Sequence, residues 1–237
     1  MPIPRDNPWQ DIQRILARAL KQCPSFSYQG QALDYAFALY NNFGLNERSI
    51  EIPIVRYWLD KGDYTEALEI GNVSNYYYRY FQDTLRCKVV VDKNERACGV
   101  INKDIADYDP GRKFDFIFSI STFEHMDADR GRNAAYKPGQ SRLKTQAADN
   151  IKHVGDAILA PGGRFVVTFP AAYEPQLDES VHAGDFEKCG FSQVHVAAYK
   201  KRAPMRWEEI SLDEARSAEY NAPLPAVNVL YVAVFTK

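Results

Sequence analysis

Three acidic side chains stand at or just beyond the ends of short apolar runs, where a carboxylate can bind a nucleoside. Glu69 comes two residues before Gly71, and Asp92 follows the next run, 21 residues beyond that glycine. An acid about 20 residues past a glycine turn can accept hydrogen bonds from ribose hydroxyls. Asp104 follows a weaker run and can accept a hydrogen bond from an adenine amino group. The spacing favours a nucleotide-type cofactor.

Each of these acids also has a structural interpretation. Glu69 can be a strand-end acid, although a carboxylate in so apolar a run is costly without a partner. Asp92 can belong to an ordinary turn, and Asp104 can cap a short helix that starts at Ile105. The sequence leaves both interpretations open at each position.

The turn after the first acid is Gly71-Asn72-Val73-Ser74-Asn75, which has a single glycine. Cofactor turns of this kind usually have further glycines, here at the positions of Val73 and Asn75. Asparagine tolerates a positive φ better than most residues, and valine does not. We therefore expect the turn to differ in shape, or the cofactor to sit further out.

A hydroxyl-rich segment follows the run Phe114–Ile120. Ser119 and Ser121 can line a cofactor site or be hydroxyls at the edge of the sheet. His125 titrates near neutral pH and is the candidate catalytic residue, as a general base toward a substrate hydroxyl. Its alternative role is to shape the pocket.

The elements that must position these residues alternate in type. Short apolar runs at 67–70, 88–91, 99–101, 114–120 and 164–169 are typical of buried parallel strands. Runs at 191–198 and 227–235 end the chain and predict an antiparallel pair. Helical spacing predicts helices over 8–22, 31–40 and 52–59, which form an N-terminal cap. The sequence predicts an α/β fold, with a helical cap over 1–60 and a cofactor-binding domain over 61–237.

Together these motifs resemble the class I S-adenosylmethionine-dependent methyltransferases. The resemblance covers about residues 65–237 and rests on Leu68-Glu69-Ile70-Gly71, Asp92, Asp104, Glu124-His125 and Ala160-Pro161-Gly162-Gly163. It implies a Rossmann-like, seven-stranded, mostly parallel sheet with helices on both faces and an antiparallel last strand. It also implies S-adenosyl-L-methionine as the cofactor and methyl transfer as the reaction.

The resemblance assigns roles to particular residues. Glu69, Gly71 and Asn72 would lie against the methionine part of the cofactor, and Asp92 against the ribose. Asp104 and the backbone of Ile105 would hold the adenine. Ser119 and Ser121 would line the floor near the sulfonium.

Two rivals remain. One is an inactive scaffold that has lost cofactor binding through Val73 and Asn75. The other is an NAD-dependent enzyme of the ordinary Rossmann type, which would not normally end in an antiparallel strand.

Composition limits the partners. A net charge of −2 gives no electrostatic footprint for nucleic acid. No apolar run approaches the about 18 residues that span a membrane. Scattered cysteines predict reduced thiols in the cytoplasm and no metal site, and His182 and Asp185 fit a solvated loop. We expect a small-molecule acceptor, methylated on an oxygen of a sugar or related metabolite. The basic segment 127–144 would favour an anionic acceptor. The oligomeric state stays open.

Overall fold

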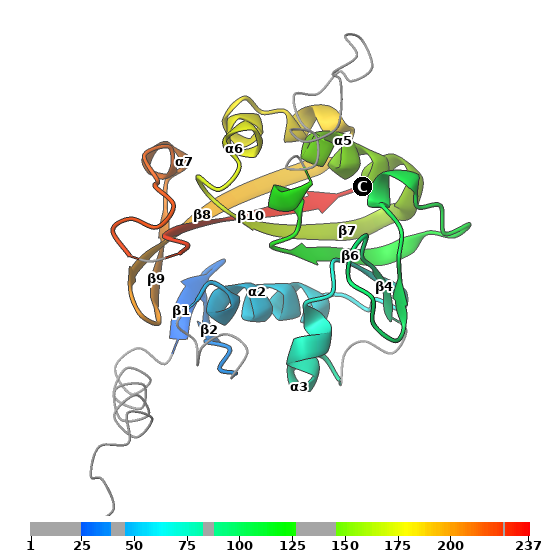
Figure 1. Ribbon diagram of the computed structural model, residues 1–237, viewed down its shortest axis with the longest axis horizontal. Coiled ribbons are helices and arrows are strands. Elements are labelled where there is room, and N and C mark those ends of the chain that lie inside the picture. The colour runs from blue at the N-terminus through cyan, green and yellow to red at the C-terminus, as the bar shows by residue number, and fades with distance from the viewer. Residues whose placement is uncertain (1–24, 39–45, 83–87, 127–145, 225) are drawn as a thin grey trace, which may run out of the picture.

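The described part of the chain, residues 25–38, 46–82, 88–126, 146–224 and 226–237, folds around an eight-stranded sheet in this computed structural model. The sheet has the order β5-β4-β3-β6-β7-β10-β8-β9 (Figure 1). The strands are β1 Ser25–Tyr28, β2 Gln31–Asp34, β3 Ala67–Ile70, β4 Lys88–Val91, β5 Val100–Ile101, β6 Phe114–Ile120, β7 Leu159–Pro170, β8 Gln193–Ala203, β9 Arg206–Ile210 and β10 Val229–Thr236. The α-helices are α2 Arg48–Asp60, α3 Tyr78–Phe81, α5 Gln146–His153, α6 Pro175–His182 and α7 Leu212–Ala215.

The sheet is parallel from β5 to β7, and β10 then pairs antiparallel with both β7 and β8. The predicted α/β class, mostly parallel sheet and antiparallel last strand are confirmed. That last strand is the feature that distinguishes the fold from the ordinary NAD-binding type.

One strand more than the seven implied by the resemblance is present. β9 pairs antiparallel with β8 at the edge of the sheet, in a polar segment where the apolar pattern predicts no strand. The chain reverses at Met205, which has a φ of 54°. Only Trp207 and Ile210 are apolar in β9, so its alternation is too short to stand out among charged neighbours.

The helix expected over 31–40 is wrong for the residues that the structure describes there. Gln31–Asp34 is β2, which pairs with β1 in a two-stranded hairpin. The turn uses Gln29 and Gly30, with φ of 51° and 74°. Two successive residues with positive φ make the type of turn that suits a two-residue hairpin loop. The helical spacing of Leu33, Ala36 and Phe37 favoured a helix, which is why the hairpin turn was not predicted.

Helix α2 confirms the expected third helix and begins four residues earlier than 52. Pro53 lies inside it and has no N–H to donate to the carbonyl of Ser49. That carbonyl instead accepts a hydrogen bond from the Ala36 N–H, at 2.8 Å. Because Pro53 leaves the Ser49 carbonyl free, this carbonyl can form the bond that ties the segment after the hairpin to α2. The expected helix over 8–22 lies outside the described residues, and the division of the chain at residue 60 stays a prediction.

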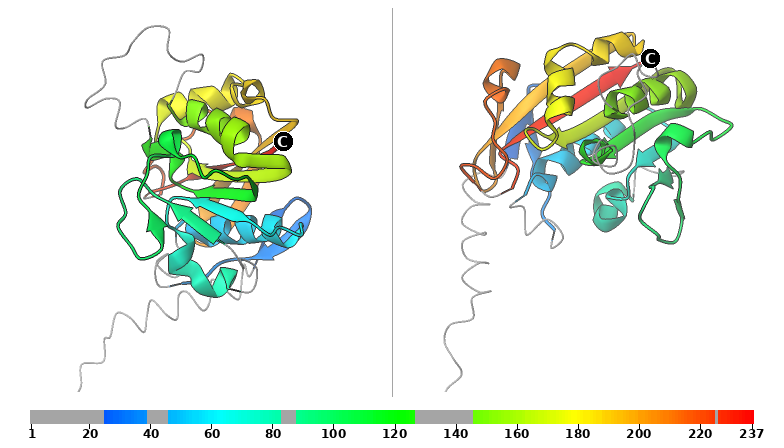
Figure 2. Two further views of the ribbon diagram at one scale, coloured as in Figure 1. Left: turned by 90° about the vertical axis from the view of Figure 1, so that its right-hand side faces the viewer. Right: turned by 45° about the horizontal axis from the view of Figure 1, so that its top comes forward.

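Side chains of the sheet alternate between two cores. Ile117 and Val167 pack on the face covered by α5 and α6. Phe116, Phe118 and Val166 pack on the opposite face, with α2 and the β1–β2 hairpin. Figure 2 shows these two layers on either side of the sheet. Helices thus cover both faces, and the strand ends are left to form a site. None of the described helices is long and apolar enough to cross a membrane.

Candidate functional site

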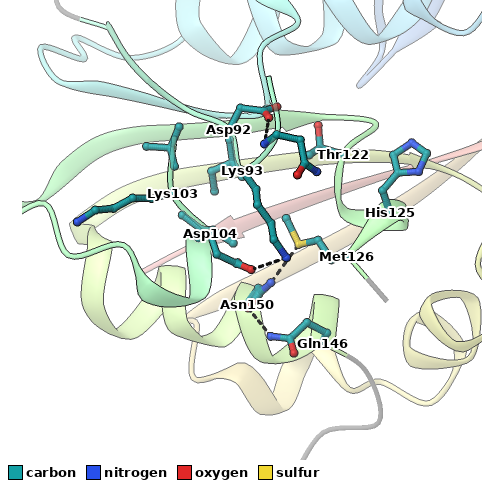
Figure 3. A pocket seen from close by; sticks show the side chains of 14 residues that line it. Asp92, Lys93, Lys103, Asp104, Thr122, His125, Met126, Gln146 and Asn150 are labelled. Carbon is teal, nitrogen blue, oxygen red and sulfur yellow. Dashed lines mark hydrogen bonds and ion pairs between the residues drawn. The ribbon is translucent and has the colours of Figure 1, made fainter. Parts of the chain in front are cut away.

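A cleft opens at the carboxyl ends of β3, β4, β5 and β6 (Figure 3). The chain runs from β3 outward to β4 and β5 and then returns to β6 on the other side of β3. Ligands of open α/β sheets bind at such a reversal of strand order. The cleft encloses about 570 Å³, including the part open to solvent.

Five of the nine predicted site residues line the cleft: Gly71, Asp92, Asp104, Ile105 and His125. The other four, Glu69, Asn72, Ser119 and Ser121, do not line it. The remaining lining residues are Ile70, Val91, Lys93, Asn94, Lys103, Thr122, Met126, Gln146 and Asn150.

Gly71 is required by its conformation and by its neighbour. Its φ is 92°, and its N–H donates to the carbonyl of Val91 at 2.8 Å. A Cβ at this position would overlap Oγ1 of Thr122, which follows β6. The glycine thus lets the loops after β3 and β6 approach each other across the cleft.

The missing glycines are accommodated by a different turn shape. Val73 has φ −94° and ψ −44°, which are right-handed helical values, and a 3₁₀ turn over Ser74–Tyr77 follows it at once. Asn75 lies inside that turn, so neither residue needs a positive φ. Val73 packs, partly buried, against the core shared with α2. Its methyl groups therefore do not line the cleft.

Glu69 shapes this turn from beneath. Its Oε1 accepts hydrogen bonds from the N–H groups of Val73 and Ser74, at 2.8 and 2.6 Å. Its Oε2 accepts from the Ser74 hydroxyl at 2.5 Å and lies 3.0 Å from Nζ of Lys88. The buried carboxylate is therefore fully partnered within the chain. Because these N–H groups face Glu69, they are not a cradle for phosphate of the kind that dinucleotides use.

Asp92 holds the loop after β4 and still has one oxygen to offer. Its Oδ1 accepts from the N–H groups of Asn94 and Glu95, at 2.8 and 2.7 Å. Its Oδ2 makes no hydrogen bond within the described part of the chain. Asn72 donates to Oε1 of Glu95 at 2.7 Å and thereby joins the loops after β3 and β4. Asn72 thus supports the Asp92 loop from outside the cleft.

Asp104 caps a helical turn, as its structural interpretation predicted, and it also lines the cleft. Its Oδ1 accepts from the Ala106 N–H at 3.1 Å. Its Oδ2 lies 3.1 Å from Nζ of Lys93, which reaches across the cleft in Figure 3. Ile105 is buried and gives the same end of the cleft an apolar wall.

The two serines have structural partners. Ser119 is buried and donates to the carbonyl of Ile70 at 2.8 Å, which ties β6 to β3. Ser121 has a φ of 40°, and its hydroxyl donates to Oε1 of Glu51 at 2.6 Å. The same Glu51 oxygen accepts from the Thr168 hydroxyl at 2.6 Å. Glu51 also pairs with Arg48.

His125 lies at the mouth of the cleft beside a buried carboxyl. Its side chain is 56% exposed and that of Glu124 only 3%, with Nε2 of the histidine 3.8 Å from Oε1 of the glutamate. Burial raises the pKa of Glu124 to about 8. Burial lowers the pKa of His125, and the Arg48 guanidinium lowers it further. At neutral pH the Glu124 carboxyl therefore largely keeps its proton, and the His125 ring is neutral.

Several cleft residues had no signal strong enough to be found in the sequence. Thr122 and Met126 flank His125 in the short segment after β6. Gln146 and Asn150 are four residues apart on α5 and bond each other at 2.9 Å, and Asn150 also donates to Sδ of Met126 at 3.1 Å. The sequence shows that Gln146 and Asn150 are four residues apart, which is a helical spacing. That their face meets the cleft follows from the tertiary fold alone.

Within the described ranges, no three His, Cys, Asp or Glu side chains converge as metal ligands.

No family model and no curated protein matches the sequence. Solved structures do match it. A SAM-dependent methyltransferase from Archaeoglobus fulgidus is similar with a TM-score of 0.51 and 14% identity, over 84% of this chain and 98% of that one. The N-methyltransferase NodS from Bradyrhizobium japonicum, solved with S-adenosyl-L-homocysteine, gives a TM-score of 0.49 and 16% identity, over 98% and 99%. The first of these shows that the chain has the Rossmann-like fold of SAM-dependent methyltransferases.

Proposed function

We propose that this protein is an S-adenosylmethionine-dependent methyltransferase that acts on a hydroxyl of a small, sugar-like molecule. The observation that carries the proposal is the convergence of Gly71, Asp92 and Asp104 on one cleft. They follow three different strands of the sheet at its topological reversal. That is where a nucleoside cofactor binds in a fold of this kind.

The residues present suit this cofactor. Gly71 lines the cleft with backbone that carries no side chain, and Asp92 has an Oδ2 without a hydrogen bond in the described part of the chain. Two ribose hydroxyls can donate to that oxygen. Ile70, Val91 and Ile105 give the cleft apolar walls for an adenine ring. When bound, the cofactor supplies a methyl group on a sulfonium that is already a good leaving group.

The chain's own contribution would be to bind and align. Methyl transfer is an in-line displacement, so holding the acceptor oxygen opposite the sulfur supplies much of the acceleration. The acceptor would lie beside His125, where an aromatic wall continues from the cleft. Tyr173 is 40% exposed and packs edge-on against His125, with ring centres 5.0 Å apart. Tyr220 packs edge-on against Tyr173 at 5.2 Å.

Two side chains of the segment after β7, Tyr173 and Asp178, could bind sugar hydroxyls. Asp178 has one oxygen, Oδ2, bonded to the Ala172 N–H at 2.6 Å, while Oδ1 is buried without a partner. Tyr173 is therefore the better placed of the two for an acceptor that arrives from solvent. The net charge argues for a small molecule and against nucleic acid as that acceptor.

Calorimetry with S-adenosylhomocysteine tests the cofactor. Asp92→Asn is the sharpest variant, because the amide keeps the oxygen that caps the loop and replaces Oδ2 with an NH₂ group. We expect about 10- to 100-fold weaker binding, since removing charged hydrogen bonds from a ribose costs about 1–3 kcal/mol. Asp109→Asn is the matched control, because Asp109 caps an exposed turn at Gly111 in the same way, outside the cleft.

The alternative function is an inactive scaffold with the same fold. It predicts no heat and no thermal shift with millimolar S-adenosylhomocysteine. Wild-type affinity in the Asp92→Asn variant would refute the ribose assignment while leaving cofactor binding in place.

A further inference from the structure

A buried carboxyl without a partner stands directly behind the exposed histidine of the cleft. Glu124 is 2% exposed, and its Oε2 has no hydrogen bond. A buried oxygen of this kind costs free energy unless something bonds it. Its other oxygen, Oε1, lies 3.8 Å from Nε2 of His125. Such a carboxyl is rarely retained for stability, so its position calls for a chemical reason.

The groups around Glu124 come from two segments of the chain. Glu47, Arg48 and Glu51 face it from the start of α2, and Tyr220 faces it from the segment before β10. The two acids of α2 raise the pKa of Glu124, and the arginine lowers it. Arg48 is itself paired with Glu51, so its charge is only partly available to Glu124. Glu124 therefore retains its affinity for a proton at neutral pH.

His125 connects this carboxyl to the cleft. Its ring lines the cleft together with Gly71 and Thr122, and its other side contacts Tyr173. A molecule lying against Tyr173 would meet His125 before it could meet Glu124. The histidine is thus the group that could touch an acceptor, and the glutamate acts through it.

We propose that Glu124 is the positioning residue of a Glu124–His125 pair that accepts the proton of the acceptor hydroxyl as the methyl group moves. This inference rests on the proposed function. The hydroxyl oxygen attacks the methyl carbon, a C–O bond forms, and the C–S bond breaks with its electron pair going to sulfur. In the form of the protein in which Glu124 is ionised, the hydroxyl proton passes to a ring nitrogen of His125, and the Glu124 carboxylate stabilises the resulting imidazolium. A buried acid that orients and supports a histidine base works in the same way in hydrolytic triads.

The pair can be tested without knowing the acceptor, by NMR. The chain has four histidines, so the ring signal of His125 can be assigned by its loss in His125→Gln. We expect this signal to titrate below pH 6.5 and to inflect again near pH 8, where Glu124 ionises. Glu124→Gln should remove the second inflection. His182, which bonds the Tyr231 hydroxyl at 3.1 Å and whose pKa is lowered by burial, is the internal control and should keep its titration in that variant.

The two cofactor forms then report whether the pair faces the reacting methyl group. S-adenosylmethionine has a positive sulfonium and S-adenosylhomocysteine a neutral sulfur. A positive charge near the pair favours the carboxylate, so the inflection near pH 8 should lie about one pH unit lower, or more, in the first complex. The same inflection pH in both complexes would overturn the inference and leave the proposed function standing.

Two other outcomes also decide whether the inference and the proposed function hold. A single titration of His125 in the wild type, or an unchanged second inflection in Glu124→Gln, would show that the residues are not paired and would overturn the inference. Failure of both ligands to bind would overturn the proposed function, and the inference with it. The signals of the free protein would then still show whether the pair exists.

Discussion

Replacing Glu124 by glutamine should make the protein more stable at neutral pH. The pKa of this carboxyl is about 8 in the folded protein against 4.5 as its ordinary value. For a carboxyl with a raised pKa, the folded state holds a proton that the unfolded chain has already released. Stability is therefore lost as the pH rises from about 4.5 to about 8. Glutamine is of similar shape and does not titrate, so the variant does not share this loss.

The size of the effect follows from the two pKa values. Each pH unit between them is worth about 1.4 kcal/mol in the free energy of unfolding. Between pH 4.5 and 7 the variant should therefore gain roughly 3 kcal/mol on the wild type, and close to 5 kcal/mol by pH 8. The absolute difference at one pH also contains the cost of burying an amide. The slope with pH is the quantity that reports on the carboxyl.

Urea unfolding, followed by the fluorescence of Trp58 and Trp207, measures this slope from pH 5 to 8.5. The difference in unfolding free energy between Glu124→Gln and the wild type should rise by about 1.4 kcal/mol per pH unit and level off above pH 8. Glu187→Gln, at an exposed position, supplies the baseline. A difference that stays constant from pH 5 to 8.5 would refute the assignment of a raised pKa to Glu124.

Two further variants probe the walls of the site. Gly71→Ala should cost about 2–4 kcal/mol and weaken binding of S-adenosylhomocysteine, because a positive φ is combined with a clash against Thr122. Gly111→Ala has a positive φ and open space, so it should cost about 1–2 kcal/mol; equal losses would rule out the clash. Glu51→Ala removes the acceptor of three donors, the buried Thr168 and the partly buried Arg48 and Ser121, and should cost about 3–5 kcal/mol. In Asp60→Ala, which breaks an exposed pair on the same helix, urea unfolding should show a loss of about 1 kcal/mol or less, and a similar loss in both would contradict the network.

The strands and two of the acids that line the cleft could be predicted because they depend on local pattern. Short β-branched runs form buried strands wherever they pack, and an acid that directly follows such a run lies at the edge of the sheet. Asp92 and Asp104 follow their strands in this way, and both line the cleft. The positions of these two residues needed no information beyond the order of elements along the chain.

The direction of the Glu69 side chain was harder to predict, because it depends on which residues of the strand face the cleft. Successive side chains of a strand point to opposite faces. Ile70 lines the cleft, so Glu69, one residue earlier, points to the other face and bonds the turn instead. The resemblance to a family named the residue but did not give the direction of its side chain.

Glu51 lay beyond reach of any local pattern. It is 70 residues from Ser121 and 117 from Thr168, which are its hydroxyl partners. These bonds exist because α2 packs beneath the ends of β6 and β7. Nothing in the segment around Glu51 shows that the fold will bring these hydroxyls to it.

A crystal structure of the protein with S-adenosylhomocysteine is the sharpest test of the proposed cofactor site. We expect the ribose within hydrogen-bond distance of Oδ2 of Asp92, the adenine beside Asp104 and Ile105, and the sulfur between Gly71 and His125. Ligand bound elsewhere, or an empty cleft in crystals grown with millimolar ligand, would contradict it.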